Sequence, residues 1–250
     1  MTDYGLVSII MPNYNGAAFL GEAVKSVLCQ TYPYFELLVI DDCSTDESLS
    51  ILGFYRDPRI HVLKNEKNLG PGGSRNRGIE AASGRFIAFL DSDDVWLPEK
   101  LERQVEFMVS RDIAFSCHGY YVCAETMDNV VKEYLPPSRV TYQDVLRNNT
   151  IGCLSAMIDL TKVGKVYMPT GRCTREDMVT WLRVLERCGE CVSVGEILGK
   201  YRTRPESVSG NKLKLVKAQY LMYRNDLALS RINAIKHLII SILEKLLHKY

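Results

Sequence analysis

Two carboxylates near the middle of the chain are spaced so that they could bind one divalent cation. Asp91 and Asp93 follow the apolar run 86–90. If that run is extended, side chains two positions apart project from the same face, so both carboxylates could reach one ion. A hard cation such as Mg²⁺ or Mn²⁺ takes oxygen ligands, usually one or two carboxylates plus substrate phosphates. The alternative is a turn and a helix cap before Trp96, because Asp and Ser favour both roles.

Polar residues also follow two apolar runs nearer the N-terminus. Pro12 and Tyr14 come after residues 6–11, and Asp42 comes after residues 36–40. Asp42 could accept hydrogen bonds from a ribose or a base edge, or it could cap the following helix. Tyr14 could stack on a base or pack in the core. These positions suit a nucleotide, but singly they do not require one.

Residues 70–78 form a glycine-rich segment that contains two arginines. It departs from the dinucleotide-binding pattern G-x-G-x-x-G, because position 75 is Arg and the segment lies between the third and fourth expected strands. A glycine-rich turn that leads into a helix still presents backbone N–H groups, and Arg75 or Arg77 adds donors for a diphosphate. The alternative is a surface loop with solvated charges.

A carboxylate later in the chain could act as a general base. Thr174 and Asp177 stand just before or within a helical pattern with apolar residues at 178, 181, 182 and 185. The spacing of these two residues fits a helix-capping arrangement, in which an acid three positions on supports the first turn. Asp177 could instead deprotonate an acceptor hydroxyl. From the residues alone both interpretations stay open.

Other common chemistries lack their residues in this sequence. The four histidines show no paired ligand spacing, and no nucleophile elbow or P-loop is present. The eight cysteines are scattered, and Cys188 and Cys191 form the one CxxC, without two nearby ligands for zinc. Scattered thiols suit a reducing cytosol, and the N-terminus shows neither a secretory signal nor a membrane span. A cytoplasmic location is therefore expected.

The elements that must position these residues alternate along the first part of the chain. Strand-like runs at 6–11, 36–40, 60–63 and 86–90 are separated by helical patterns at 18–30, 48–55 and 74–82. This order predicts an α/β fold with a mainly parallel, mixed sheet flanked by helices. Ligands of such sheets bind beyond the carboxyl ends of the strands, where the polar segments above lie. After residue 98 the expected elements are a helix to 110, strands at 114–122, 130–134 and 154–158, and a helix at 142–147.

The charge of the chain is divided unevenly. Residues 211–250 carry a net charge of +6, which leaves −5 for residues 1–210 and +1 for the whole chain. Apolar residues recur there at helical spacing, at Ile232, Ile235, Leu238, Ile239, Ile242, Leu246 and Leu247. This predicts a basic amphipathic helical tail over residues 211–250, which could lie on an anionic bilayer or pack on the catalytic domain or a second subunit.

Taken together, these segments resemble the family 2 glycosyltransferases with the GT-A fold, over roughly residues 6–210. The resemblance rests on residues 7–15, 30–32, 39–46, 68–79, 84–94, 175–182 and 201–209. Residues 151–153 and the helix at 174–182 look closest to small bacterial enzymes of O-antigen, capsule and teichuronic acid synthesis. The resemblance implies a catalytic domain over residues 1–210, with a nucleotide-sugar-binding half at 1–97 and an acceptor-binding half at 98–210.

The resemblance also implies roles for individual residues. Tyr14 and Asp42 would hold the uracil, Asp91 would touch the ribose or the metal, Asp93 would bind the metal, and Asp177 would be the base. Further donor contacts would come from Pro12, Arg75, Arg202 and Arg204. Two positions depart from the family pattern. Many relatives carry His in place of Arg204, and Cys43 replaces the usual Gly after the paired acids.

The implied reaction is an inverting transfer of a hexose, with Mn²⁺ or Mg²⁺ as cofactor. The favoured donors are UDP-glucose and UDP-galactose, and the expected acceptor is an undecaprenyl diphosphate-linked GlcNAc or GalNAc of bacterial surface polysaccharide synthesis. A peripheral position at the inner face of the cell membrane is expected, with no nucleic-acid partner. The alternatives are a sugar-phosphate nucleotidyltransferase, whose basic glycine-rich first loop is missing at residues 12–16, and a noncatalytic glycan-binding protein.

Overall fold

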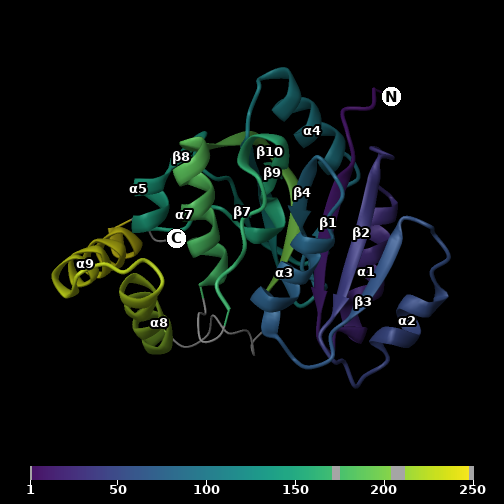
Figure 1. The fold of residues 1–250 in the computed structure, drawn as a ribbon, viewed down its shortest axis with the longest axis horizontal. Coiled ribbons are helices and arrows are strands. Elements are labelled where there is room, and N and C mark those ends of the chain that lie inside the picture. Colours follow the sequence, from purple (N-terminus) through teal and green to yellow (C-terminus); the bar gives the residue numbers. More distant parts are fainter. Residues whose placement is uncertain (1, 171–174, 204–211, 248–250) are drawn as a thin grey trace.

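The protein folds around one ten-stranded sheet with helices on both faces, as a computed structural model of residues 2–170, 175–203 and 212–247 shows (Figure 1). The strands are β1 Val7–Asn13, β2 Phe35–Asp41, β3 Ile60–Lys64, β4 Phe86–Phe89, β5 Val95–Trp96, β6 Phe115–Ala124, β7 Val130–Tyr134, β8 Arg139–Thr141, β9 Met157–Asp159 and β10 Glu190–Thr203. The helices are α1 Ala17–Leu28, α2 Ser48–Phe54, α3 Gly70–Ala81, α4 Lys100–Ser110, α5 Tyr142–Arg147, α6 Leu160–Val163, α7 Glu176–Cys188, α8 Lys212–Asn225 and α9 Arg231–Leu247, with a 3-10 turn at Cys153–Ser155.

The first half of the sheet is parallel, and its strands β1, β2 and β4 are buried on both faces, whereas the edge strand β3 is partly exposed. Its strand order is β3-β2-β1-β4, and all three pairings are parallel. Ile9 and Met11 of β1 pack with α1 and α4 on one face, whereas Ile10 packs with α3 and α7 on the other. A strand covered on both sides has an almost continuous apolar sequence, which is how residues 6–11 appear. The carboxyl ends of β1, β2 and β4 therefore meet at one edge.

The second half of the sheet is mixed. β9 pairs antiparallel with β4 and β6, whereas β10 runs parallel to β6 and antiparallel to β5 and β8. Helix α7 covers this half through Trp181, which is fully buried and lies 5.6 Å from Phe89 and 5.5 Å from Phe115 between ring centroids. The expected α/β fold, a mainly parallel mixed sheet flanked by helices, is confirmed. The division at residues 97 and 210 stays a prediction.

Helix α3 begins earlier than the sequence suggests. The glycine-rich residues form its first turn, because the Asp42 carboxylate accepts the backbone N–H groups of Leu69 and Gly70, both at 2.8 Å. Gly73 is buried in this turn, where an added Cβ would lie 2.6 Å from Leu69 Cβ. The segment is thus a closely packed helix start rather than an open loop. The strand expected at 154–158 also differs from the prediction. It is the shorter β9, because a 3-10 turn at Cys153–Ser155 precedes it.

The C-terminal helices pack on the rest of the protein as a hairpin (Figure 1). Tyr223 of α8 is fully buried and its hydroxyl donates to the carbonyl of Leu146 at the end of α5, at 2.7 Å. On α9, Ala234 and Leu238 pack against the same core, whereas Ile232 is 80% exposed. The apolar positions of the tail therefore divide between two faces. Within the described ranges, no helix has the length and apolar character needed to cross a bilayer.

Candidate functional site

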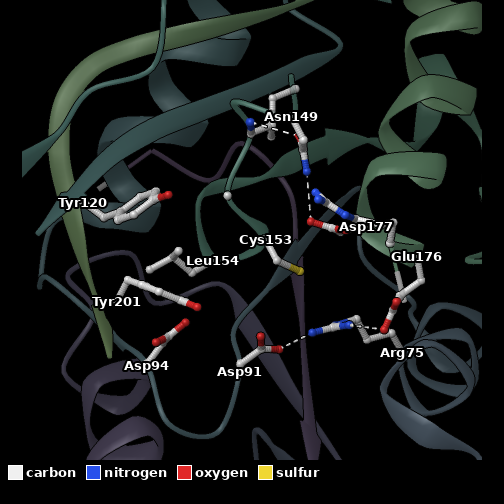
Figure 2. A pocket seen from close by; sticks show the side chains of 13 residues that line it. Arg75, Asp91, Asp94, Tyr120, Asn149, Cys153, Leu154, Glu176, Asp177 and Tyr201 are labelled. Atoms are coloured by element: carbon white, nitrogen blue, oxygen red, sulfur yellow. Dashed lines mark hydrogen bonds and ion pairs between the residues drawn. The ribbon is translucent and has the colours of Figure 1, made fainter. Parts of the chain in front are cut away.

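A pocket of about 400 Å³ opens where the turn after β4 meets the start of α7 and the segment that leads into the 3-10 turn (Figure 2). Most of its polar lining is ionisable, with two tyrosines opposite the start of α7. The ionisable and amide side chains are Arg75, Asp91, Asp94, Asn149, Arg175, Glu176 and Asp177. Residues separated widely in sequence thus form one polar cavity.

Asp177 lies in the first turn of α7 and its side chain enters this pocket. Its carboxylate oxygen Oδ2 accepts a hydrogen bond from Asn149 Nδ2 at 3.0 Å. Burial raises the pKa of the Asp177 carboxyl, against the opposing attraction of Arg75 and Arg175. Thr174, the partner in the expected capping arrangement, lies outside the described residues. The described geometry gives Asp177 the pocket position and the raised pKa that suit a general base.

Arg75 connects acids on two sides of the pocket. It projects from α3, is 8% exposed, and donates from one guanidinium nitrogen to Asp91 Oδ1 at 2.5 Å. Its other terminal nitrogen lies 3.9 Å from Glu176 Oε1. Burial disfavours its charge, but the neighbouring Asp91 more than compensates, so the pKa of Arg75 is raised and the guanidinium stays charged. Burial also raises the pKa of Glu176.

Arg202 supports the turn after β4 from behind. Its backbone N–H donates to the buried Asp94 carboxylate at 2.9 Å, and its Nε donates to the carbonyl of Asp93 at 2.9 Å. Its guanidinium stacks 4.4 Å above the Phe19 ring and pairs with Glu22 at 2.5 Å. Arg202 was expected to contact the donor, but these protein partners already hold its guanidinium. It therefore shapes the turn that carries the paired acids.

The turn after β4 has a donor set that fits a hard divalent cation. Asp91 and Asp93 supply two carboxylates, the number that Mg²⁺ commonly takes from a protein before substrate phosphates complete its shell. Asp91 is 31% exposed and faces the pocket. Asp94 fits less well, because burial raises its pKa well above the ordinary value. Among the residues that the structure describes, no three His, Cys, Asp or Glu side chains are grouped as a complete metal site.

The residues expected to hold the nucleoside lie at the ends of β1 and β2, beside the pocket rather than in its lining. Tyr14 is 56% exposed, as an aromatic side chain offered to a base would be. Asp42 is buried, and besides the two backbone groups at the start of α3 it accepts Asn65 Nδ2 at 2.7 Å. Cys43 adopts a left-handed φ of 66°, a conformation that Gly, the residue expected here from the family resemblance, adopts without strain.

The structure brings three of the predicted residues together in the pocket and distributes the others around it. Arg75, Asp91 and Asp177 line the cavity. Asp93 is in the turn, and Pro12 is half-buried at the end of β1. Arg204 lies outside the described residues.

Several lining residues were not among the site residues predicted from the sequence. Tyr120 of β6 and Tyr201 of β10 lie side by side with ring centroids 5.9 Å apart, although they are far apart in the chain. Burial raises the pKa of Tyr201 to about 12, so its hydroxyl stays protonated. A Cβ at Gly152 would lie 2.7 Å from Tyr120 Cε1, so this glycine makes room for the ring. Asn149, which donates to Asp177, was also not predicted from the sequence.

Known proteins share both the sequence pattern and the fold. Residues 8–161 match the family model described as Glycosyl transferase family 2. The chain is 43% identical over 221 residues, 88% of its length and 87% of the relative's, to Bacillus subtilis (strain 168) TuaG, whose name describes a teichuronic acid biosynthesis glycosyltransferase. It is 40% identical over 88% of its length, and 85% of the relative's, to Escherichia coli WfgD, named UDP-Glc:alpha-D-GlcNAc-diphosphoundecaprenol beta-1,3-glucosyltransferase.

A solved structure extends the comparison to three dimensions. The structure of Staphylococcus aureus TarS 1–349 in complex with UDP superposes with a TM-score of 0.71 at 22% identity, covering 96% of this chain and 71% of that one. This likeness shows the fold, and the expected GT-A fold is confirmed. Because the family model spans more than half of the chain and TuaG is similar over most of both lengths, this transferase belongs to glycosyl transferase family 2.

Proposed function

We propose that the protein transfers a hexose from a UDP-sugar, UDP-glucose or UDP-galactose, to a GlcNAc or GalNAc carried on undecaprenyl diphosphate, with inversion of configuration. The observation that carries the proposal is that the buried Asp177 carboxylate and the Asp91–Arg75 pair line the same pocket. A base and a diphosphate-binding region in one cavity can serve both substrates of a transfer. The printed name of WfgD supports the acceptor and the glucose donor, and the UDP complex of TarS supports the nucleotide.

Asp177 acts in this proposal as the general base. It accepts the proton of an acceptor hydroxyl while the hydroxyl oxygen attacks the anomeric carbon from the side opposite the leaving UDP, so the configuration inverts. The pKa of Asp177, raised by burial, brings the carboxylate closer to the basicity that proton abstraction near neutral pH requires. The charged Arg75 stabilises negative charge that develops on the diphosphate.

The donor is held by residues from the parallel half of the sheet. Tyr14 stacks on the uracil. Asp42 accepts a hydrogen bond from the uracil through a carboxylate lone pair that its protein partners do not use. Pro12 and Arg204 complete the donor contacts, and Arg202 acts on the donor through the turn that it supports. Asp91 and Asp93 hold Mn²⁺ or Mg²⁺, which when bound neutralises charge on the leaving diphosphate.

A panel of nucleotide sugars tests the proposed substrates. The protein is incubated with a synthetic polyprenyl diphosphate GlcNAc and, separately, UDP-glucose, UDP-galactose or UDP-GlcNAc, and the product linkage is determined by NMR. We expect a disaccharide from UDP-glucose or UDP-galactose, with a β linkage formed from the α-linked donor. Retention of the α configuration would contradict the single-displacement mechanism.

We further propose that α9 contacts an anionic membrane surface at the inner face of the cell membrane, where a polyprenyl-linked acceptor is reached. One face of α9 exposes apolar side chains at Ile232, Ile235, Ile239, Ile242 and Leu243. Arg231 and Lys236 are exposed on the same helix. Apolar residues edged by basic ones bind the plane of an anionic bilayer. Docking of a second copy through this face would bring together two tails that each carry a net charge of +6, and these would repel each other.

Flotation with vesicles checks the membrane proposal. We expect full-length protein to float with phosphatidylglycerol-containing vesicles at low salt, and the double variant Ile235→Asp/Ile239→Asp to remain at the bottom with its KM for the donor unchanged. Point variants are preferable to truncation at residue 210, because α8 and α9 bury core side chains. Val131→Asp, an exposed apolar position on β7, is the matched control. Wild-type protein that stays at the bottom, or a dimer broken by the double variant, contradicts the proposal.

A further inference from the structure

We infer that Asn149 is a positioning residue that holds the Asp177 carboxylate in the orientation needed to take the acceptor proton; this rests on the proposed role of Asp177 as base. Asn149 Nδ2 donates to Asp177 Oδ2 at 3.0 Å (Figure 2). The hydrogen bond engages one carboxylate oxygen. The carboxylate also interacts with the backbone N–H of Met178, and its remaining lone pairs can accept a hydrogen bond from a substrate hydroxyl.

The amide of Asn149 has one orientation available to it. Its Oδ1 accepts the backbone N–H of Ile151 at 3.2 Å, so the opposite side of the amide must present the NH₂ group to Asp177. Rotating the amide by half a turn would break both hydrogen bonds and face two oxygen atoms against each other. The donor is therefore directed at the carboxylate by the backbone.

The segment that carries Asn149 is fixed to the rest of the protein at the next two residues. Tyr134 of β7 donates from its hydroxyl to the carbonyl of Thr150 at 2.8 Å. Trp181 donates from Nε1 to the carbonyl of Ile151 at 3.1 Å, and its ring is fully buried. Trp181 belongs to the same helix as Asp177, one turn further on. The base and the residue that positions it are therefore both attached to α7, Asp177 directly and Asn149 through the hydrogen bond of Trp181.

A neutral donor suits this task better than a charged one. The groups that face the pocket with Asp177 already include two cations, three acids and three weakly acidic groups, which are Arg75 and Arg175, Asp91, Asp94 and Glu176, and Tyr120, Cys153 and Tyr201. A third cation would lower the pKa of Asp177 and weaken it as a base. An amide fixes the carboxylate without adding charge, so the raised pKa persists.

Two substitutions of Asn149 separate positioning from structural support. Asn149→Asp keeps an oxygen to accept the Ile151 N–H, so it leaves the segment anchored while replacing the donor by a like-charged group. Asn149→Ala removes both bonds. We expect each variant to lower kcat by about 10- to 100-fold, the scale of a misplaced catalytic group, with the KM for the UDP-sugar unchanged. The acid limb of the kcat profile should move to higher pH, because both changes disfavour ionised Asp177.

The control is Asn148→Ala, one residue earlier, whose side chain makes no hydrogen bond to any described part of the chain. It should leave kcat and the pH profile as in the wild type. Wild-type kcat in Asn149→Asp, or a loss confined to melting temperature with an unshifted pH profile, overturns the inference. If Asp177→Asn is inactive in that case, only the inference fails. If Asp177→Asn turns over normally, the proposed base fails and the inference with it.

Discussion

Replacing Asp177 with Asn is expected to lower kcat by about 10²- to 10⁴-fold, the usual contribution of a general base, while UDP binding and folding persist. Asn preserves the size of the side chain but cannot accept the hydroxyl proton. Because burial raises the pKa of the Asp177 carboxyl, the ionised base in the wild type is lost, as pH falls, at a higher pH than for an ordinary aspartate. The pH dependence of kcat measures the loss of the base, and a titration with UDP measures whether nucleotide binding persists.

A helix-capping aspartate elsewhere in the chain provides the control for Asp177. Asp144 caps α5, where its carboxylate accepts the backbone N–H of Thr141 at 2.9 Å. Asp144→Asn should cost on the order of 1 kcal/mol of folding stability and leave kcat unchanged. If Asp177→Asn behaves in the same way, with near-normal kcat and a lower melting temperature, Asp177 is a cap and the proposed mechanism is wrong.

Removing divalent cations is expected to lower the rate by at least about 10³-fold, since several kcal/mol of charge stabilisation at the leaving diphosphate are lost. Activity should vanish in EDTA and return with Mn²⁺ or Mg²⁺. Asp93→Ala should bind UDP weakly in the presence of either ion, because one of the two proposed carboxylate ligands is missing. Calorimetric titration with UDP, with and without metal, measures the difference.

Asp57→Ala is the matched control for the metal prediction. Asp57 pairs with Arg59 at 2.8 Å, before β3 and outside the pocket lining. Its loss should leave UDP affinity and metal response unaltered. Full turnover in EDTA by the wild-type protein would remove metal from the mechanism.

The inner strands of the parallel half were predictable from the sequence because burial on both faces leaves an almost continuous apolar pattern. Residues 6–11 and 36–40 appear as β1 and β2, and the polar residues after them lie at one edge. The start of α3 could not be predicted from the sequence, because glycine in isolation favours turns. Here the Asp42 carboxylate accepts the first N–H groups, and tight packing excludes larger side chains. Tertiary contacts outweighed local preference.

The pocket itself could be predicted only in part. Asp91 and Asp177 stand in short motifs, whereas Asn149 and Tyr120 meet them through pairings between distant strands and helices that no local spacing encodes. Arg202 shows the opposite difficulty. Its sequence context suggests a ligand contact, but the carbonyl of Asp93, the Glu22 carboxylate and the Phe19 ring surround its guanidinium.

The tail illustrates a limit of helical periodicity. The apolar positions of residues 232–247 appear as one stripe in the sequence, but α9 turns Leu238 towards the core and leaves Ile232 and Ile239 exposed. Periodicity identifies which residues share a helix face. It does not identify what covers that face, because the partner surface comes from α5 and α8.

The most direct test of glycosyl transfer is the release of UDP with and without the lipid-linked acceptor. We expect UDP to appear rapidly only when a polyprenyl diphosphate GlcNAc is present, in equal amount to the disaccharide formed, and we expect Asp177→Asn to abolish both. UDP release at the same rate without acceptor, or acceptor binding without any disaccharide, would contradict it.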